Sequence, residues 1–370
     1  MRYSIRIVSS ETEFASLRDA WDALVKVAVD GNTFLTHLWL HAWWVSYRPK
    51  ASLCILLCER DGILVGIAPM MLMRDGGAGR LFRKLRFVGD GTYETDHMNF
   101  IVSSDDRQEV LDELLRAIDR LPWDVAHINQ IPETSLNAQQ FIAHAAKRGW
   151  LVSTERLPCP RRTLPASFSE LMASLPGRLR TTIRSSIRDL HKSHAVEFGY
   201  VQRQEELAEA LDVLFRNHAA RWQAKGQTGV FVDERKREFY ARISSQLLAE
   251  GSLRFFHLKV DGRIVAQQFC FEHTGTVMLL QEGFDTAFAN LNVGNVLRAL
   301  VFEHLIATDM KVYDFLEGTS RHKQSWSDNA PCDLRIRACR ASLIGRAAHH
   351  LPRLAAKLKR KLQPETVTAN

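Results

Sequence analysis

The chain has 370 residues, of which 46% are hydrophobic and 25% charged, and its formal net charge is +7. This length exceeds one ordinary hydrophobic core, so we expect two domains, and the composition excludes a disordered or fibrous protein. No window approaches 18 uninterrupted apolar residues, which argues against a membrane-spanning helix. The first eight residues alternate like a strand and lack an apolar signal core, which favours a cytoplasmic location.

The basic residues are concentrated near the C-terminus. Nine Lys and Arg residues lie in 334–364, a segment without Asp or Glu, and they more than account for the net charge. The rest of the chain is nearly neutral, so nucleic acid is not the expected partner. The basic tail at 343–370 has apolar residues at helical intervals, so a peripheral contact with an anionic membrane is an alternative to a solvated terminus.

The six cysteines lack the spacing of a metal site. None of them forms the Cys-x-x-Cys pair of a zinc knuckle. We therefore expect buried, reduced thiols and no bound metal.

Helices and strands alternate along the first half. The apolar pattern predicts helices at 11–29, 38–45, 105–121 and 136–148. It predicts strands at 53–58, 63–73, 81–88, 98–102, 124–129 and 150–156. The prolines at 158, 160 and 165 then predict a domain boundary. The expected domains are 1–160 and 161–342, followed by the tail at 343–370.

The second half opens with the segment 167–175, which a basic helix follows. Arg180, Arg184, Arg188 and Lys192 recur every four residues beside an apolar stripe, which is typical of an amphipathic helix. Further helices are expected at 203–225, 234–250 and 293–308. An antiparallel meander starts at Leu253, and a last strand covers 311–315.

The two halves repeat one pattern 200 residues apart. Segments 59–67 and 259–267 each contain a strand, an Asp-Gly turn and a second strand. A helical segment precedes each hairpin, and a strand, a helix and a strand follow it. The chain is therefore expected to be a duplicated α/β (α+β) architecture, in which each domain is a mixed, mostly antiparallel sheet flanked by helices.

The loop around Gly294 is a candidate anion site. Strand 277–284, which ends in Gly283 and Phe284, leads to Val293, Gly294 and Asn295 at the start of an apolar-periodic helix. Free backbone N–H groups and the helix dipole favour an anion there, and glycine permits close approach. A glycine that merely eases a turn is the alternative.

The loop from Asp314 to Trp326 is a candidate catalytic segment. A strand that ends in Asp314 and is followed by Gly318 places polar groups at a sheet edge. Acyl transfer needs a base and donors for an oxyanion; His322 or Glu282 suits the first role and Lys323 the second. A solvated basic loop remains the alternative.

Other polar residues are candidates for binding an acceptor, each with a purely structural alternative. His218, Arg221 and Trp222 share or adjoin one helix face, which could equally be a packed surface. Arg184 belongs to a ridge that could hold an anionic substrate or face solvent. Tyr93 and Asp96 lie in a loop rich in glycine and acidic residues, and Trp326 closes the last loop.

The order of the short motifs given below resembles that of the GNAT superfamily over roughly 5–340. More specifically, they resemble the tandem acetyltransferases of the CelD type, associated with cellulose or exopolysaccharide biosynthesis, and the chain also resembles FemAB-type transferases. The motifs are the aromatic segment 34–44, Gly66-Ile-Ala-Pro69, Phe87-Val-Gly89-Asp90, the block 215–226, Asp261-Gly262, Gly283-Phe-Asp285, Gly294, and Asp314-Phe315-x-x-Gly318 with Lys323 and Trp326.

The resemblance implies two tandem GNAT-like domains and acetyl-CoA as co-substrate. The acceptor would be a small molecule or a glycan or cell-envelope precursor. Two departures concern the site: Gly294 stands alone where the family usually has two glycines, and His322 precedes Lys323 where relatives commonly have tyrosine. FemAB-like transfer from aminoacyl-tRNA, and a degenerate fold acting as an assembly or membrane-surface module, are the alternative functions.

Overall fold

The computed structural model describes residues 2–74, 82–223, 226 and 228–350. The chain divides into two units by its internal contacts. Unit 1 comprises 1–37, 49–156 and 333–370, and unit 2 comprises 38–48 and 157–332. None of the helices in the described ranges combines the length and the hydropathy that crossing a bilayer requires.

Unit 1 is built from two sheets with helices against them, within the described residues. Its helices are α1 (Glu11–Ser16), α2 (Arg18–Val27), η1 (Thr33–Leu35), α4 (Arg107–Arg120) and α5 (Leu136–Lys147). Its strands are β1 (Tyr3–Val8), β2 (Ala51–Leu53), β3 (Ile55–Arg60), β4 (Ile63–Ala68), β5 (Met70–Met73), β6 (Lys84–Phe87), β7 (Ile101–Val102), β8 (Val125–Pro132), β9 (Leu151–Pro158) and β16 (Cys332–Cys339).

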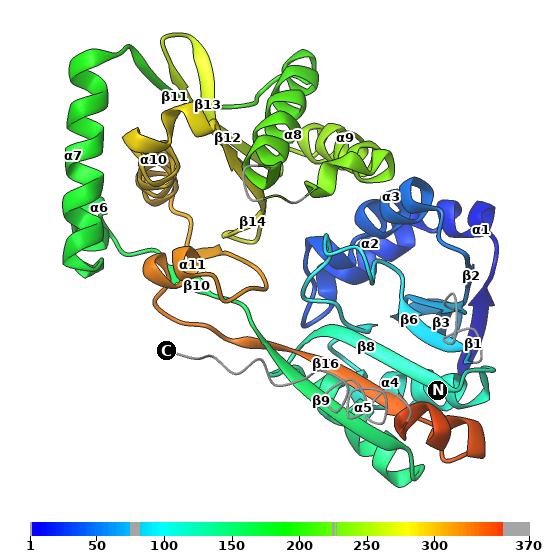
Figure 1. The fold of residues 1–370 in the computed structure, drawn as a ribbon. Coiled ribbons are helices and arrows are strands. Elements are labelled where there is room, and N and C mark those ends of the chain that lie inside the picture. The colour runs from blue at the N-terminus through cyan, green and yellow to red at the C-terminus, as the bar shows by residue number, and fades with distance from the viewer. Residues whose placement is uncertain (1, 75–81, 224–225, 227, 351–370) are drawn as a thin grey trace. The chain divides into compact units, whose positions relative to one another are not determined.

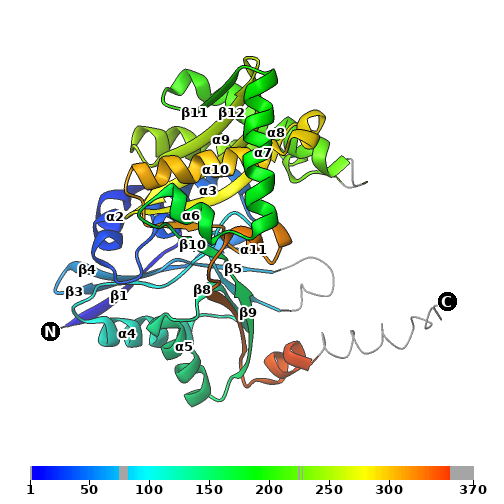
Figure 2. The same cartoon turned by 90° about the vertical axis from the view of Figure 1, so that its left-hand side faces the viewer.

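The sheets of unit 1 have the orders β1-β3-β4-β7 and β2-β5-β6-β8-β16-β9. The first is antiparallel throughout, and β6 and β8 form a parallel pair in the second. Helix α4 packs on β3 and β4, and α5 runs beside α4 (Figure 2). Gly66 of β4 lies under Val110 and Leu114 of α4, where a Cβ atom would fall 2.3 Å from Val110 Cγ1.

Unit 2 contains one continuous sheet among its described residues. Its helices are α3 (His37–Tyr47), α6 (Phe168–Ser174), α7 (Gly177–Ser193), η3 (Gln204–Glu206), α8 (Leu207–Gln223), η4 (Val230–Val232), α9 (Glu234–Ala249), η5 (Thr286–Leu291), α10 (Val293–Ala307) and α11 (Arg321–Trp326). Its strands are β10 (Arg161–Thr163), β11 (Val196–Tyr200), β12 (Leu253–Val260), β13 (Arg263–His273), β14 (Thr276–Phe284) and β15 (Val312–Asp314).

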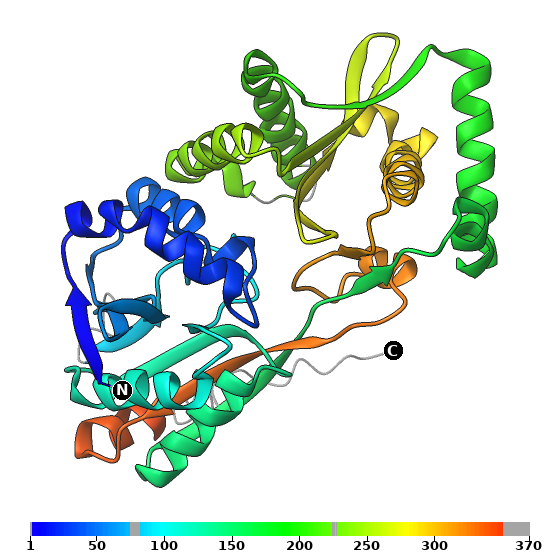
Figure 3. The ribbon, with the colours of Figure 1, turned by 180° about the vertical axis from the view of Figure 1, so that it is seen from behind.

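The sheet of unit 2 has the order β10-β15-β14-β13-β12-β11. All neighbours are antiparallel except β14 and β15, which run parallel. Helices α8 and α9 cover one face, whereas α7 and α10 lie on the other, as Figures 1 and 3 show. The core between the sheet and α10 is rich in aliphatic and aromatic side chains, among them Phe256, Phe302 and Trp326.

The hairpin repeat expected from the sequence is present in both units. Asp61 and Gly62 have φ values of 51° and 84°, and Asp261 and Gly262 have 50° and 77°. Both turns therefore have two left-handed residues, as a type I′ hairpin requires. The register also shifts at the same place, between Cys58 and Glu59 and between Leu258 and Lys259. The predicted fold class, two tandem α/β units with mixed, mostly antiparallel sheets flanked by helices, is confirmed.

The units are not continuous halves of the chain. Helix α3 belongs to unit 2. There Trp39 packs edge-on against Phe239 of α9, with ring centres 5.4 Å apart, and its ring is tilted against Phe271 of β13 at 5.0 Å. Conversely, β16 pairs with β8 in unit 1. A division of the chain at 160 therefore places both segments in the other unit. Helix α3 is apolar on nearly every side, so it can be buried away from its sequence neighbours.

Candidate active site

A cavity of about 200 Å³ lies in unit 2 beside the N-terminus of α10. All five residues predicted to bind the cofactor line it, and so do the predicted catalytic residues Glu282 and His322 and the helix residue Arg221. The complete lining is Arg221, Ala266, Gln267, Gln268, Glu282, Gly283, Phe284, Ala289, Asn292, Val293, Gly294, Asn295, Leu297 and His322. The fold thus gathers residues from β13, β14, α8, α10 and α11 around one space.

The N-terminus of α10 presents unused donors to this cavity. Asn292 precedes the helix in a left-handed conformation, with φ 54°, and its side chain donates to Ser186 of α7 rather than capping α10. In the described chain, no acceptor faces the backbone N–H groups of Val293 or Gly294. A Cβ on Gly294 would meet only Phe284, at 3.7 Å, so the fold itself leaves room there. These donors and the helix dipole suit a phosphate group.

Three titratable side chains meet at the site, of which Glu282 and His322 line the cavity and Arg298 does not. Glu282 of β14 pairs through one oxygen with Arg298 of α10, and its other oxygen lies 3.2 Å from His322 Nε2. Burial alone would raise the pKa of the Glu282 carboxyl, but the Arg298 guanidinium and the His322 imidazole hold that pKa well below its usual range. A carboxylate kept ionised in this way is a weak base, so the arrangement favours His322 as the base and Glu282 as its partner.

Lys323 and Asp314 shape the final loop. Lys323 Nζ donates to the carbonyl oxygens of Phe315 and Glu317, each at 2.6 Å. Asp314 accepts from Arg161 Nε at 2.5 Å and from the Leu316 backbone N–H at 2.8 Å. Neither residue lines the cavity. An ammonium bound to carbonyl groups supports the loop, so the expected oxyanion role of Lys323 gains no support from its position.

The helix face at 215–226 is mainly a packed surface. His218 is buried, accepts from Trp222 Nε1 at 2.9 Å, and packs edge-on against Phe231. Burial, together with the nearby Arg221 and the cation Lys236, lowers the pKa of His218 to about 4. His218 is therefore neutral near pH 7 and serves packing, whereas Arg221 lies over the Phe284 ring and reaches the cavity.

The remaining predicted acceptor residues lie outside the lining. Arg184 is exposed on α7. Each residue turns an α-helix by about 100°, so Arg184 lies roughly 160° around the helix from Ser186, the residue that contacts Asn292 of the cavity. Trp326 is buried and donates to Asn295 Oδ1 at 3.2 Å, which ties α11 to α10. Tyr93 and Asp96 belong to unit 1, where Tyr93 is 90% exposed and buried Asp96 accepts from Gln130.

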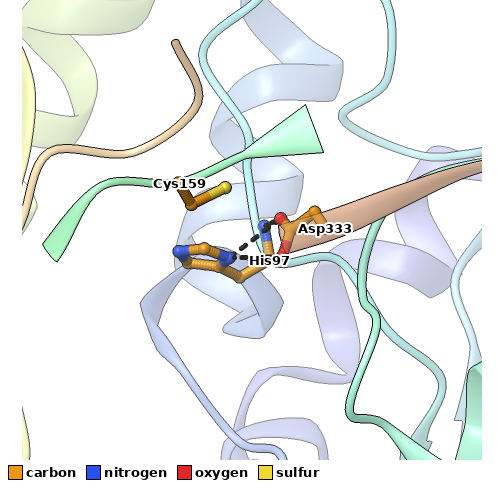
Figure 4. A group of neighbouring side chains, drawn as sticks. All are labelled: His97, Cys159 and Asp333. Atoms are coloured by element: carbon orange, nitrogen blue, oxygen red, sulfur yellow. Dashed lines mark hydrogen bonds and ion pairs between the residues drawn. The ribbon is translucent and has the colours of Figure 1, made fainter. Parts of the chain in front are cut away.

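The loop of unit 1 that contains Asp96 also holds a buried acid–imidazole pair. His97 Nδ1 lies 2.9 Å from Asp333 Oδ2, and the His97 backbone N–H donates to the same carboxylate (Figure 4). The His97 carbonyl accepts from Asn32. These contacts fix the loop at φ 47° for His97, a left-handed conformation uncommon outside glycine.

Sequence reasoning missed Arg298, the most buried charge at the site. Its signal was an arginine within the apolar periodicity of the α10 segment, combined with Glu282 in an otherwise apolar strand. Gln267 and Gln268 were also missed; both are 1% exposed and line the cavity. Polar residues at strand positions expected to be apolar are such a signal.

Comparison with known proteins places this geometry in context. Residues 177–324, which contain the cavity, match the family model of the acetyltransferase (GNAT) domain. No curated protein matches the sequence.

Solved structures resemble the whole chain at low sequence identity. The structure of FemX is similar with a TM-score of 0.63 and 10% identity, covering 95% of this chain and 99% of FemX. A conserved protein of unknown function from Bacteroides thetaiotaomicron VPI-5482 has a TM-score of 0.58 and 17% identity, covering 90% of this chain and all of that protein. L-PGS from Bacillus licheniformis has a TM-score of 0.52 and 12% identity, covering 92% and 96%. These likenesses concern the fold.

Proposed function

We propose that the chain is an acyltransferase that moves an acyl group, acetyl in the simplest case, from coenzyme A to an amine or hydroxyl acceptor. The observation that carries this proposal is the cavity itself, where a helix N-terminus with unpartnered N–H groups adjoins a histidine–carboxylate pair. The match of 177–324 to the acetyltransferase (GNAT) domain supports it.

In the proposed reaction, each group has a separate task. The N–H groups of Val293 and Gly294 bind the pyrophosphate, and the pantetheine chain lies along β14 near Gly283 and Phe284. His322 takes a proton from the acceptor while the acceptor atom attacks the thioester carbonyl. The C–S bond then breaks, and the leaving CoA thiolate takes up the proton that His322 removed from the acceptor.

The acceptor class is proposed from the resemblance to CelD-type proteins. It is a small molecule or a polysaccharide or cell-envelope precursor. Arg221 is the acceptor-side candidate that lies in the cavity lining. The roles of Tyr93, Asp96, Arg184 and Trp326 in acceptor binding stay predictions.

Calorimetry and thermal unfolding with acetyl-CoA test the donor half of the proposal. A ligand at about 100 times its dissociation constant should stabilise the native state by about 2.7 kcal/mol. His322→Gln should retain this binding and lose transfer, because the imidazole acts on the acceptor. Absence of both a heat of binding and a melting shift above ~100 μM acetyl-CoA would contradict the proposal.

A second candidate function is aminoacyl-tRNA-dependent transfer of the FemAB type. Four exposed basic residues of α7 favour it, because they lie within about 120° around the helix and so form one basic surface: Arg178, Arg184, Arg188 and Lys192. Retention of tRNA that weakens steeply with salt, and weakens further in an Arg184→Glu/Arg188→Glu double variant, is expected if this candidate holds. If tRNA binding is absent or independent of salt while the protein binds acetyl-CoA, the second candidate is rejected and the first proposal stands.

A third candidate function is non-enzymatic: a degenerate transferase fold that contacts a membrane surface through its basic tail. The tail from 351 onward lies outside the described residues. Flotation with liposomes of anionic lipid should recover the full chain and lose a chain that ends at Ser342. Equal behaviour of the two chains contradicts a peripheral membrane role.

A further inference from the structure

Arg298, Glu282 and His322 form a chain of three side chains from α10, β14 and α11. Arg298 has no exposed surface and binds Glu282 through Nη2. Its guanidinium carbon lies over two aromatic rings, 5.0 Å from the centre of the Phe315 ring and 5.9 Å from that of Trp326. The following inference rests on the proposed transfer reaction, in which His322 is the base.

The burial of Arg298 is energetically costly. In the part of the chain that the structure describes, its Nε and Nη1 atoms have no hydrogen-bond partner. Burying a guanidinium with unpaired N–H groups destabilises a fold, and the neighbouring rings offset only part of that cost. An unbranched apolar side chain against Phe315 and Trp326 would serve packing better. The charge of Arg298 therefore requires an explanation other than stability.

The geometry supplies this explanation through Glu282. An ionised carboxylate has two oxygens and accepts only. Arg298 occupies Oε2, which leaves Oε1 turned towards His322 Nε2 at 3.2 Å. In the described chain this contact does not meet hydrogen-bond geometry, and Nε2 has no hydrogen-bond partner. The ion-pair contact of 3.2 Å with Oε1 nevertheless favours a proton on Nε2, which leaves Nδ1 open. The imidazolium formed during proton transfer also gains a neighbouring negative charge.

We propose that Arg298 is a positioning residue, which pins one oxygen of Glu282 so that the other orients His322 with Nδ1 free to take the proton of the acceptor.

Other groups around the three residues complete their electrostatic environment. Arg221 of α8 also lines the cavity, and its charge helps to lower the pKa of Glu282. Cys270 of β13 and Tyr313 of β15 lie near Glu282 and Arg298, and burial raises the pKa of both side chains, so they stay neutral near pH 7. Lys323, next to His322, is bound to carbonyl groups of its loop. Arg298 is thus the cation in direct contact with Glu282.

The test compares variants that change the charges in opposite directions. Arg298→Met removes a positive charge, so the pair of Glu282 and His322 takes up a proton more readily. The acid limb of the kcat/KM–pH profile should then move to higher pH by about one unit or more. Glu282→Gln removes a negative charge and should move the same limb to lower pH. Arg298→Lys keeps the charge and should leave the limb in place.

A buried arginine elsewhere in unit 2 provides the matched control. Arg162 of β10 is 6% exposed, also has an unpartnered Nε, and donates to Ser174. It lies two strands away from β14 in the sheet. Arg162→Met should cost stability like Arg298→Met but leave the pH profile unchanged. Arg298→Met should lower kcat about 10-fold or more with little change in the KM for acetyl-CoA, because a misoriented base loses part of the roughly 10²- to 10⁴-fold that general-base catalysis contributes.

An activity-independent measurement separates this inference from the proposed function. The imidazole NMR signal that disappears in His322→Gln is titrated with pH in each variant. Opposite shifts of its midpoint in Arg298→Met and Glu282→Gln support the arrangement even if no acyl transfer is found, in which case the proposed function alone fails. An unchanged midpoint in Arg298→Met, or equal shifts in Arg298→Met and Arg162→Met, overturns the positioning role.

Discussion

Replacing Gly294 by alanine should raise the stability of the protein and lower its affinity for acetyl-CoA. The new Cβ would meet only Phe284 Cδ1, at an ordinary contact distance of 3.7 Å, and Gly294 lies in the first turn of α10 without a positive φ. Glycine to alanine at such a helical position stabilises by about 0.4–1 kcal/mol. In the proposed complex, however, the methyl group stands where the pyrophosphate approaches the backbone.

The expected loss of affinity follows from the hydrogen bond that this methyl group disturbs. A hydrogen bond to a charged group contributes about 1.5–3 kcal/mol, which corresponds to a roughly 10- to 100-fold weaker dissociation constant. Titration calorimetry with acetyl-CoA measures the affinity, and urea unfolding of the ligand-free protein measures the stability. Gly177→Ala is the matched control, because it is also a first-turn helix glycine with open space around it. Unchanged affinity in Gly294→Ala would refute pyrophosphate binding at this helix.

Three further outcomes are expected. Calorimetry should find one acetyl-CoA per chain, because the corresponding helix of unit 1, α4, follows Asp106, whose carboxylate pairs with Arg60 and would repel a phosphate; two equivalent sites would contradict this. The pKa of His218 is lowered to about 4, so as the pH falls the unfolded chain takes up a proton on this residue before the native chain does. Between pH 6.5 and 4 the free energy of unfolding of the wild type should therefore fall, relative to that of His218→Gln, by up to about 3 kcal/mol. Equal pH dependence of the two proteins would refute this. Lys323→Met should lower the urea midpoint by an amount equivalent to about 1–3 kcal/mol, because the carbonyl groups of Phe315 and Glu317 lose their donor. An unchanged midpoint together with lost acyl transfer would instead support a catalytic role for Lys323.

Local signals in the sequence predicted the local features well. The two Asp-Gly turns were readable because a type I′ hairpin requires two left-handed residues, and these pairs satisfy that requirement at small cost. The start of α10 at Val293 and Gly294 was readable from glycine followed by an apolar helical period. Both features depend on neighbours within a few residues, so one sequence suffices to find them.

Features that depend on distant residues could not be read in the same way. The pair of Arg298 and Glu282 joins a helix to a strand 16 residues earlier, and apolar periodicity alone does not reveal which charges meet. Lys323 was assigned to an oxyanion because its sequence position is near His322, yet its flexible side chain turns back to the loop carbonyls. The direction of a long side chain is decided by the acceptors around it, which spacing does not specify.

The placement of α3 and β16 has a consequence for the order in which the protein can be made and folded. Helix α3 emerges early from the ribosome with Trp39 and other apolar side chains, whereas its partners Phe239 and Phe271 follow some 200 residues later. Likewise, β8 cannot pair with β16 until the chain has been synthesised to Cys339. A nascent or truncated first half therefore exposes an aromatic helix and an unpaired strand edge, both of which promote aggregation and slow folding. Expression of either half alone should yield insoluble protein, and co-expression of the two should recover it.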